Sequence, residues 1–342
     1  MKRISLLAAS ALLIASSTLY GGENVISCPD IETILELSIE DEPQTPDSIE
    51  FSMTNELLGT TIAKIAVKKG IKKIKKTIKK KVKDPNSLLF SNRLFPGKGP
   101  RTVRIVTYNV GTFTKSGYNS IGMVSDMLRE MKADVAGIQE IDSCTARTGN
   151  VFQLAQLAEL TGGWNYCFTP ALDSYQGGSY GIGIISKSKL PILDRWSLEL
   201  EKGKGSEERA LNVVEFKKFV LATTHLDHKN ETAQFEQACK VTNALMTRYA
   251  GSRKVIILCG DFNATPNSKT IKEMKKSWTL VSSQSKTYPS DKAQKCIDYI
   301  MVLDNASSYD LKRSFVAREF KDGKVSEASD HLPVWIDIRP RR

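Results

Sequence analysis

The apolar run at residues 255–258 is the feature that most constrains the fold, because it leads directly into a turn at Gly260. A short apolar run bounded by glycine is typical of a strand that is buried on both faces of a sheet. Asp261 and Asn263 follow the run, so an acid and an amide leave the carboxyl end of this strand. In open α/β sheets, ligands bind in the crevice beyond such strand ends. Asp and Asn also favour ordinary turns, so the rest of the chain has to decide between a capped turn and a binding site.

Other predicted strands end in polar side chains in the same way. We expect strands at 102–108, 135–138, 180–186, 208–216, 219–224, 255–259, 297–302 and 332–338, and helices at 121–131, 151–160 and 231–249. Mixed strands with helices between them predict an α/β layered domain. The polar residues at or beside these strand ends are Asn109, Glu140, His225, Asp261, Asn263, Asp298, Asp330 and His331. A set rich in carboxylates and without thiols suits a hard cation, so we expect Mg²⁺, with Mn²⁺ and Ca²⁺ as alternatives.

The order of seven short motifs resembles the endonuclease/exonuclease/phosphatase superfamily. The motifs are TYNV, IQE, YGIGIIS, THL, GDFN, IDYI and SDHLP, and they lie between Arg101 and Ile338. This superfamily is similar in fold to pancreatic-type deoxyribonucleases, sphingomyelinases and inositol polyphosphate phosphatases. The resemblance implies a four-layer sandwich, in which two mixed β-sheets pack face to face and helices cover them. It leaves residues 1–100 outside the match.

The resemblance also implies which residues hold the metal and the phosphate. Glu140, with Asn109 nearby, is expected to hold the divalent ion, and Asp330 to assist. Asn263 is expected to donate a hydrogen bond to the phosphate. Arg209 is a second candidate for phosphate binding, because a guanidinium suits a phosphate oxygen; a surface arginine is the alternative.

The remaining site residues are implied to move or hold protons. Asp261 is expected to orient or deprotonate the attacking water, and Asp298 to hold His331 in one tautomer. His225 is expected to donate to the phosphate or to the leaving group. The sequence does not identify a carboxylate that would orient His225, and Asp173 is the one candidate.

The first 22 residues predict export. A basic start, Met1-Lys2-Arg3, precedes an uncharged apolar stretch at residues 4–20, which is the pattern of a signal peptide. We therefore expect an extracellular or periplasmic protein. The residues that end at Cys28 resemble a lipoprotein cleavage box, so a lipid anchor there is an alternative.

Residues 23–100 are predicted to be an acidic and then lysine-rich extension with a linker, before a catalytic domain at 101–342. The segment from Lys64 to Lys83 holds 11 lysines and no acid, and the net charge of the whole chain is +11. Its apolar residues recur in steps of three and four, which predicts an amphipathic helix. Such a helix can contact an anionic membrane surface or a nucleic-acid backbone; a solvated helix docked by its apolar stripe is the alternative.

Six cysteines in an exported chain permit disulfides. Cys144 and Cys167 lie near the ends of neighbouring predicted elements, and we expect them to form a bridge.

These observations predict a secreted Mg²⁺-dependent phosphoester hydrolase. The favoured substrate is nucleic acid, because export, the lysine segment and the two site histidines suit a nuclease. A phospholipid hydrolase of the sphingomyelinase kind or an inositol-phosphate hydrolase is the alternative. A polyanion-binding module without catalysis is the third possibility.

Overall fold

A computed structural model describes residues 94–115, 117 and 119–341. The predicted signal peptide, Cys28 and the segment from Lys64 to Lys83 lie outside the described residues. None of the helices in the described ranges is long and apolar enough to span a membrane.

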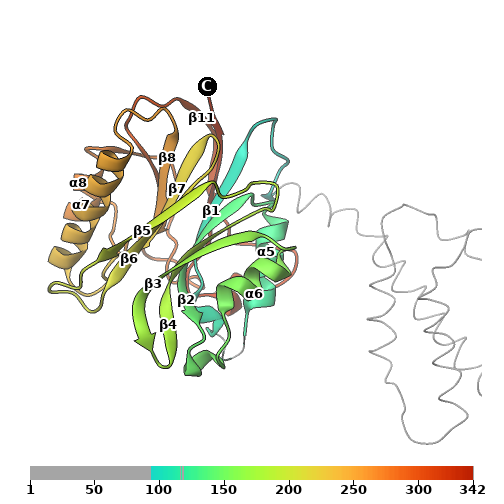
Figure 1. The fold of residues 1–342 in the computed structure, drawn as a ribbon. Helices are drawn as coiled ribbons and strands as arrows, with labels where there is room; N and C mark the ends of the chain where they lie inside the picture. Colours follow the sequence, from blue (N-terminus) through green and yellow to red (C-terminus); the bar gives the residue numbers. More distant parts are fainter. Residues whose placement is uncertain (1–93, 116, 118, 342) are drawn as a thin grey trace, which may run out of the picture. The chain divides into compact units, whose positions relative to one another are not determined.

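Two six-stranded sheets form the centre of the fold (Figure 1). In spatial order, the first sheet contains β11 (Tyr309–Val316), β12 (Val334–Pro340), β1 (Val103–Asn109), β2 (Val135–Ser143), β4 (Gly178–Ser186) and β3 (Asn165–Tyr175). The second contains β5 (Asp194–Leu200), β6 (Arg209–Glu215), β7 (Phe219–His225), β8 (Val255–Asp261), β10 (Asp298–Leu303) and β9 (Trp278–Leu280). Both sheets are mixed: β1 and β2 are parallel, β7 and β8 are parallel, and the other pairs are antiparallel.

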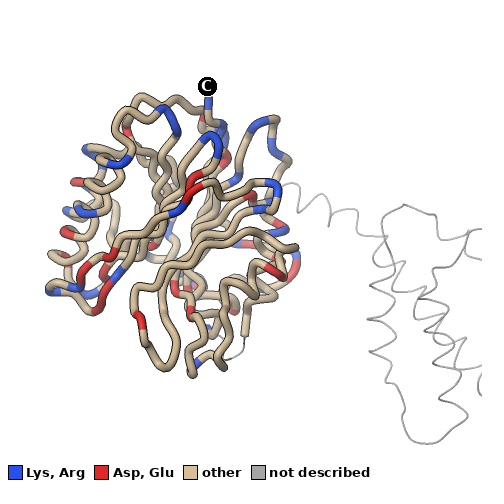
Figure 2. Tube along the Cα trace, in the orientation of Figure 1, with Lys and Arg blue, Asp and Glu red and all other residues tan. Residues whose placement is uncertain are grey.

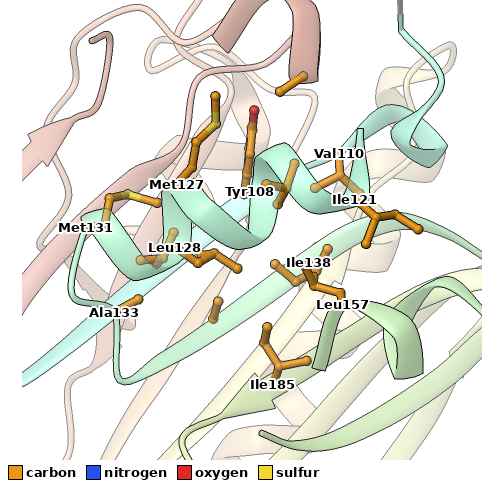
Figure 3. Packing of buried hydrophobic residues seen from close by; sticks show 14 of the residues in the cluster. Tyr108, Val110, Ile121, Met127, Leu128, Met131, Ala133, Ile138, Leu157 and Ile185 are labelled. Carbon is orange, nitrogen blue, oxygen red and sulfur yellow. The ribbon is translucent and has the colours of Figure 1, made fainter. Parts of the chain in front are cut away.

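Helices cover the outer face of each sheet, so the domain has four layers, as the sequence predicts. The first sheet packs against α5 (Ile121–Glu130), α6 (Gln153–Leu160) and the short α9 (Val325–Ala328). The second packs against α7 (Glu231–Arg248) and α8 (Lys269–Met274). Two 3₁₀ turns, η3 (Gly111–Phe113) and η4 (Ala146–Thr148), follow β1 and β2. Figure 3 shows Leu128 of α5 and Ile138 of β2 in the apolar cluster between this helix and the first sheet.

A third apolar cluster fills the space between the sheets. It joins Ile105 and Ile336 of the first sheet to Leu221, Ile257 and Ile300 of the second, all fully buried. Many of the charged residues lie on α7 and in the loops (Figure 2). Residues 255–258, buried at every position, are therefore a strand covered on both faces, as their apolar composition predicts.

Gly137 marks a place where the two sheets approach closely. A Cβ atom at this position would lie 2.6 Å from Cys259 Sγ and 2.8 Å from Thr223 Oγ1, both on the opposite sheet. Gln139 lies two residues after Gly137 on β2, and its Nε2 donates to Thr223 Oγ1 at 2.8 Å. The close approach requires glycine and fixes the sheets to each other near the strand ends that carry the polar residues.

The expected bridge between Cys144 and Cys167 is wrong, since both thiols are free. Cys167 lies on β3 opposite Ile184 of β4, and Ile184 lies opposite Gly137 of β2. The strand β4 thus separates the two cysteines, and Cys144 lies seven positions further along β2 than Gly137. At about 3.3 Å per residue, that separation far exceeds the Cα distance that a disulfide allows.

The end of the predicted linker already packs on the domain. Phe95 is buried, and its ring stacks on Phe320 with a centroid distance of 5.2 Å. Pro96 O accepts a hydrogen bond from Arg104, which also forms a fully buried ion pair with Asp337 at 2.7 Å. The domain boundary near Arg101 stays a prediction, but in the described part the chain contacts the domain from Leu94 onward.

Candidate functional site

The predicted site residues meet where the ends of five strands from both sheets converge. In the second sheet, Asp261 of β8 lies opposite His225 of β7 on one side and opposite Asp298 of β10 on the other. In the first sheet, Asn109 ends β1, and its Nδ2 donates both to Glu140 Oε1 at 2.9 Å and to Asp261 Oδ2 at 3.0 Å. One amide group thus joins the carboxylates of the two sheets.

Unusual backbone conformations aim two of these side chains. Glu140 has a φ of +57° and Asn263 a φ of +49°, in the left-handed region that few non-glycine residues adopt. The register between β2 and β4 also shifts between Ile138 and Ile141, so Glu140 lies in a β-bulge. Bulges near active sites re-aim side chains, and such strain commonly marks functional positions.

Asp261 is a buried carboxylate at the centre of the cluster. Its Oδ1 accepts a hydrogen bond from the backbone N–H of Asn263 at 2.8 Å. Burial raises the pKa of Asp261 above its usual range, His331 opposes this rise, and Asp298 adds to it. A buried carboxylate with a raised pKa can accept a proton near neutral pH, which is what a general base requires.

His331 lies between two carboxylates. Its Nδ1 is 3.0 and 3.2 Å from the two oxygens of Asp298, and its Nε2 is 3.6 Å from Asp261 Oδ2. The backbone N–H of His331 donates to Ser329 Oγ, and the ring of Tyr288 packs against it at a centroid distance of 4.9 Å. Burial alone would lower the pKa of His331, but Asp298 and then Asp261 raise it above its usual value. The environment therefore favours the imidazolium.

The environment of His225, in contrast, favours the neutral imidazole. Burial lowers the pKa of its imidazole well below the usual value, and the Arg209 guanidinium lowers it further. Its Nδ1 is 3.1 Å from Arg209 Nη1, and its Nε2 is 3.0 Å from Asn263 Nδ2. Asp173 does not orient this ring, because it is an exposed residue of β3 that accepts a hydrogen bond from Ser179. His225 is thus oriented by a cation rather than by the carboxylate we expected.

Arg209 is a buried residue that contacts three side chains. Besides His225, its guanidinium lies 3.0 Å from Glu207 Oε1 and 3.0 Å from His228 Nδ1. Its side chain is 2% exposed, so the surface-arginine alternative is wrong, while its role in phosphate binding stays a prediction. Glu207 and His228 are not predicted from the sequence; the only signal is that His228 is the third histidine of the chain and follows His225 by three residues.

A guanidinium and two aromatic rings lie beside Glu140. Arg147 lies over the rings of Tyr175 and Tyr180, at 4.9 and 5.2 Å, and both oxygens of the buried Asp142 hold it. Burial raises the pKa of Tyr180 well above its usual value, and the charge of Glu140 contributes next. Tyr180 therefore lies within electrostatic range of the site. We refer to Arg147, Tyr175 and Tyr180 as the aromatic wall, which no sequence motif indicates.

The oxygen donors of the site fit a hard divalent cation. Glu140 and Asp261 offer carboxylates held by the same Asn109 amide, and such oxygens are the ligands that Mg²⁺ prefers. A second group, Asp261, Asp298 and His331, has ligand atoms that all lie within 4.8 Å of one another. We favour the Glu140 side for the metal, because the raised pKa of His331 favours a cationic ring without a lone pair to donate.

Asp330 is the predicted ligand with the most open position. Its side chain is 31% exposed, and its Oδ2 lies 3.9 Å from Lys115 Nζ. Its Oδ1 lies 3.4 Å from where a Cβ atom on Gly111 would be. Asp330 thus lies beside the turn that follows β1, and its role as a ligand stays a prediction.

Buried acids, amides, one histidine that favours the cation and one that favours the neutral ring suit the hydrolysis of a phosphate ester. The family model described as the endonuclease/exonuclease/phosphatase family matches residues 106–331. The chain belongs to this family, and it is therefore a phosphoesterase of a superfamily that in general depends on divalent metals.

Several solved structures share this fold. The mannosyl-6-phosphatase of Bacteroides thetaiotaomicron is 18% identical with a TM-score of 0.57, over 69% of this chain and 99% of that chain. The catalytic domain of human Nocturnin is 16% identical with a TM-score of 0.54, over 70% and 94%. Truncated TDP2 of Caenorhabditis elegans is 13% identical with a TM-score of 0.53, over 70% and 97%. No curated protein matches the sequence. At these identities the likeness shows the fold alone.

Proposed function

We propose that the protein is an exported, Mg²⁺-dependent phosphodiesterase that cleaves nucleic acid. The observation that carries the proposal is the pair of histidines on either side of Asp261. His331 is held as a cation by Asp298 and Asp261, and His225 is held neutral beside Arg209. This arrangement offers both an acid and hydrogen-bond donors around one buried base. Export rests on the first 22 residues of the sequence.

Glu140, with Asn109 and with Asp330 assisting, would hold the metal. When bound, the ion would supply Lewis-acid polarisation of a phosphoryl oxygen and would offset charge on the leaving oxygen. The protein's own groups do the rest. Asp261 accepts the proton of the attacking water, because its raised pKa makes it a base that works near neutral pH.

The donors of the site face the charge that develops on the phosphate. The imidazolium of His331 and the amide of Asn263 stabilise the negative oxygens, and donors that are already in place provide much of the catalysis in such sites. Asp298 holds His331 through Nδ1, so that Nε2 faces the reacting group. His225 Nε2 faces the same space and donates to the phosphate or to the leaving oxygen.

The aromatic wall supports a nucleic-acid substrate. A planar guanidinium over two tyrosine rings provides the kind of surface on which a base can stack, and base–aromatic stacking contributes about 1–3 kcal/mol per base. Both oxygens of Asp142 hold the Arg147 guanidinium, which fixes it over the two rings. Phospholipids and inositol phosphates have no aromatic ring to stack on this wall.

Turnover assays test the proposal. The purified protein is incubated with plasmid DNA, sphingomyelin and inositol phosphates, each with Mg²⁺ and with EDTA. We expect cleavage of DNA that EDTA abolishes. Arg147→Ala should raise KM for DNA and leave kcat on a small phosphodiester without a base unchanged. Turnover confined to sphingomyelin or to inositol phosphates would overturn the choice of substrate. Activity that survives EDTA would overturn the dependence on a divalent metal.

A further inference from the structure

We propose that Arg209 is a positioning residue that fixes His225 in its Nε2–H tautomer. Arginine carries five N–H donors and no acceptor, and it keeps its charge in proteins. A guanidinium nitrogen 3.1 Å from His225 Nδ1 therefore requires that Nδ1 accept the hydrogen bond. The proton of the neutral ring then has to lie on Nε2, the nitrogen that faces Asp261 and Glu140.

The surroundings of Arg209 prevent it from turning away. On one side Glu207 Oε1 lies 3.0 Å from Nη1, and on the other His228 Nδ1 lies 3.0 Å from Nη2. The loop that carries Glu207 is itself fixed, because Asp227 accepts hydrogen bonds from the backbone N–H and the hydroxyl of Ser206. Both terminal nitrogens of this buried guanidinium thus have directed donors, while its Nε has no partner among the described residues.

Asp227 also fixes the segment that carries His228. Its other oxygen accepts hydrogen bonds from the backbone N–H groups of Lys229 and Asn230, both at 2.8 Å. Burial would raise the pKa of Asp227, but the hydrogen bonds from Ser206, and then those from Asn230 and Lys229, outweigh it and lower the pKa to about 2, so the carboxylate is charged at neutral pH. One carboxylate therefore holds both loops that flank Arg209.

A second contact favours the opposite tautomer. Asn263 Nδ2 lies 3.0 Å from His225 Nε2 and also donates to Leu226 O at 3.0 Å, which fixes the orientation of the amide. The Asn263 amide can donate to Nε2 only if Nε2 carries no proton, whereas Arg209 can donate to Nδ1 only if Nδ1 carries no proton. A neutral imidazole offers one acceptor nitrogen, so one of the two contacts cannot be a hydrogen bond in the metal-free protein.

The contact with Arg209 prevails for two reasons. Leaving a buried cationic donor without an acceptor costs more than leaving a neutral amide hydrogen without one. In addition, two carboxylates lie on the Nε2 side, with Asp261 Oδ2 at 3.5 Å and Glu140 Oε1 at 3.9 Å, and both favour a proton on Nε2. The second Asn263 amide hydrogen is left without a protein acceptor and is free to donate to the substrate.

This inference concerns the free protein, and its catalytic consequence rests on the proposed function. With the proton on Nε2, His225 presents a donor to the phosphate or to the leaving oxygen, and it is not a base. Arg209 acts through His225, so its loss should lower kcat more than it raises KM. The tautomer itself can be observed without metal, substrate or turnover.

Nitrogen-15 NMR of histidine-labelled protein tests the tautomer directly. The chain contains three histidines, so His228→Gln and His331→Gln variants assign the spectrum. In the wild-type protein at neutral pH without metal, we expect the His225 Nε2 resonance to be that of a protonated nitrogen and the Nδ1 resonance that of an acceptor. The reverse pattern would overturn the inference and would show that Asn263 sets the tautomer.

Two variants test whether Arg209 is the cause. Methionine is similar in size to arginine but has no N–H donor in its side chain. In Arg209→Met the Asn263 amide should therefore donate to His225 Nε2, and the proton of the neutral ring should move to Nδ1. Arg209→Lys keeps a cationic donor and should retain the wild-type pattern. Arg147→Met, which removes a guanidinium that is held by Asp142 and not by His225, is the matched control and should leave the pattern unchanged. Retention of Nε2–H in Arg209→Met would overturn the assignment to Arg209.

Kinetics separate this inference from the proposed function. If the protein hydrolyses DNA, Arg209→Met should lower kcat by about 10-fold or more, on the scale of lost proton or hydrogen-bond donation, and Arg209→Lys should recover part of the loss. If no substrate is turned over while the NMR pattern is as expected, the proposed function fails and the tautomer assignment stands.

Discussion

Replacing Asp298 with asparagine should make His331 lose its proton at lower pH. Asp298 lies 3.0 Å from His331 Nδ1 and is the largest of the influences that raise the pKa of this ring to about 10 from an ordinary 6.5. An opposite charge at this distance shifts a pKa by about 1–3 units. Each unit corresponds to about 1.4 kcal/mol, so Asp298→Asn should remove about 1.4–4 kcal/mol of stabilisation from the imidazolium. Asparagine has nearly the same shape, so the packing around the ring should survive.

The rate of the enzyme as a function of pH measures this change. If protonated His331 stabilises the reacting phosphate, kcat/KM should fall at high pH as the ring loses its proton. In Asp298→Asn, the pH at which kcat/KM falls should be lower by about 1–3 units. Asp330→Asn is the control, because Asp330 contributes less to the pKa of His331 than Asp298 and Asp261 do; its effect on the fall should be smaller. If kcat/KM of Asp298→Asn falls at the same pH as that of the wild-type protein, the reasoning is refuted.

The same substitution should also change stability in a pH-dependent way. The folded pKa of His331 lies above its unfolded value of 6.5, so the protonated ring stabilises the fold below pH 6.5, and this contribution disappears as the pH rises through about 10. Asp298→Asn should therefore lower the free energy of unfolding most below pH 6.5 and progressively less toward pH 10. Urea unfolding across this range measures the difference.

Three further predictions follow from other parts of the chain. Glu140→Ala should abolish most Mg²⁺-dependent turnover and weaken Mg²⁺ binding in calorimetry without unfolding the protein; unchanged affinity would contradict the ligand assignment. Asp337→Asn should cost about 3–5 kcal/mol in urea unfolding, because it leaves the buried Arg104 cation unpaired, and a loss below about 1 kcal/mol would show that the pair is not needed. Deletion of residues 64–83 should spare turnover of a small phosphodiester and abolish salt-sensitive binding to duplex DNA or anionic vesicles; retention of both would favour the solvated-helix alternative.

The strands that could be predicted are those at the centre of each sheet. Eight predicted strands correspond to β12, β1, β2 and β4 of the first sheet and to β6, β7, β8 and β10 of the second. The four that were not predicted, β11, β3, β5 and β9, are the edges of the two sheets. Central strands are covered on both sides and keep an apolar pattern. An edge strand such as β5, whose residues alternate between exposed and partly buried, carries charges that hide its periodicity.

The members of the site could be predicted because strand ends bring them together, but their partners could not. Asp298 and Asp261 follow from the apolar strands that precede them, and the structure places them opposite each other. The contact of Arg209 with His225 depends on the register between β6 and β7 and on how the Glu207 loop folds back. No local pattern of residues carries that information, so the search for a carboxylate led to Asp173, on the wrong strand.

The two site histidines show how one fold gives the same side chain two charge states. His331 and His225 are both almost fully buried, and burial by itself would keep both neutral. Asp298 on β10 and Asp261 on β8 raise the pKa of His331 despite its burial. Arg209 on β6 lowers the pKa of His225 further. When Asp261 accepts a proton from water it becomes neutral, and Asp298 is then the carboxylate that keeps His331 a cation. The site can therefore take up that proton and still present donors from both rings to the phosphate.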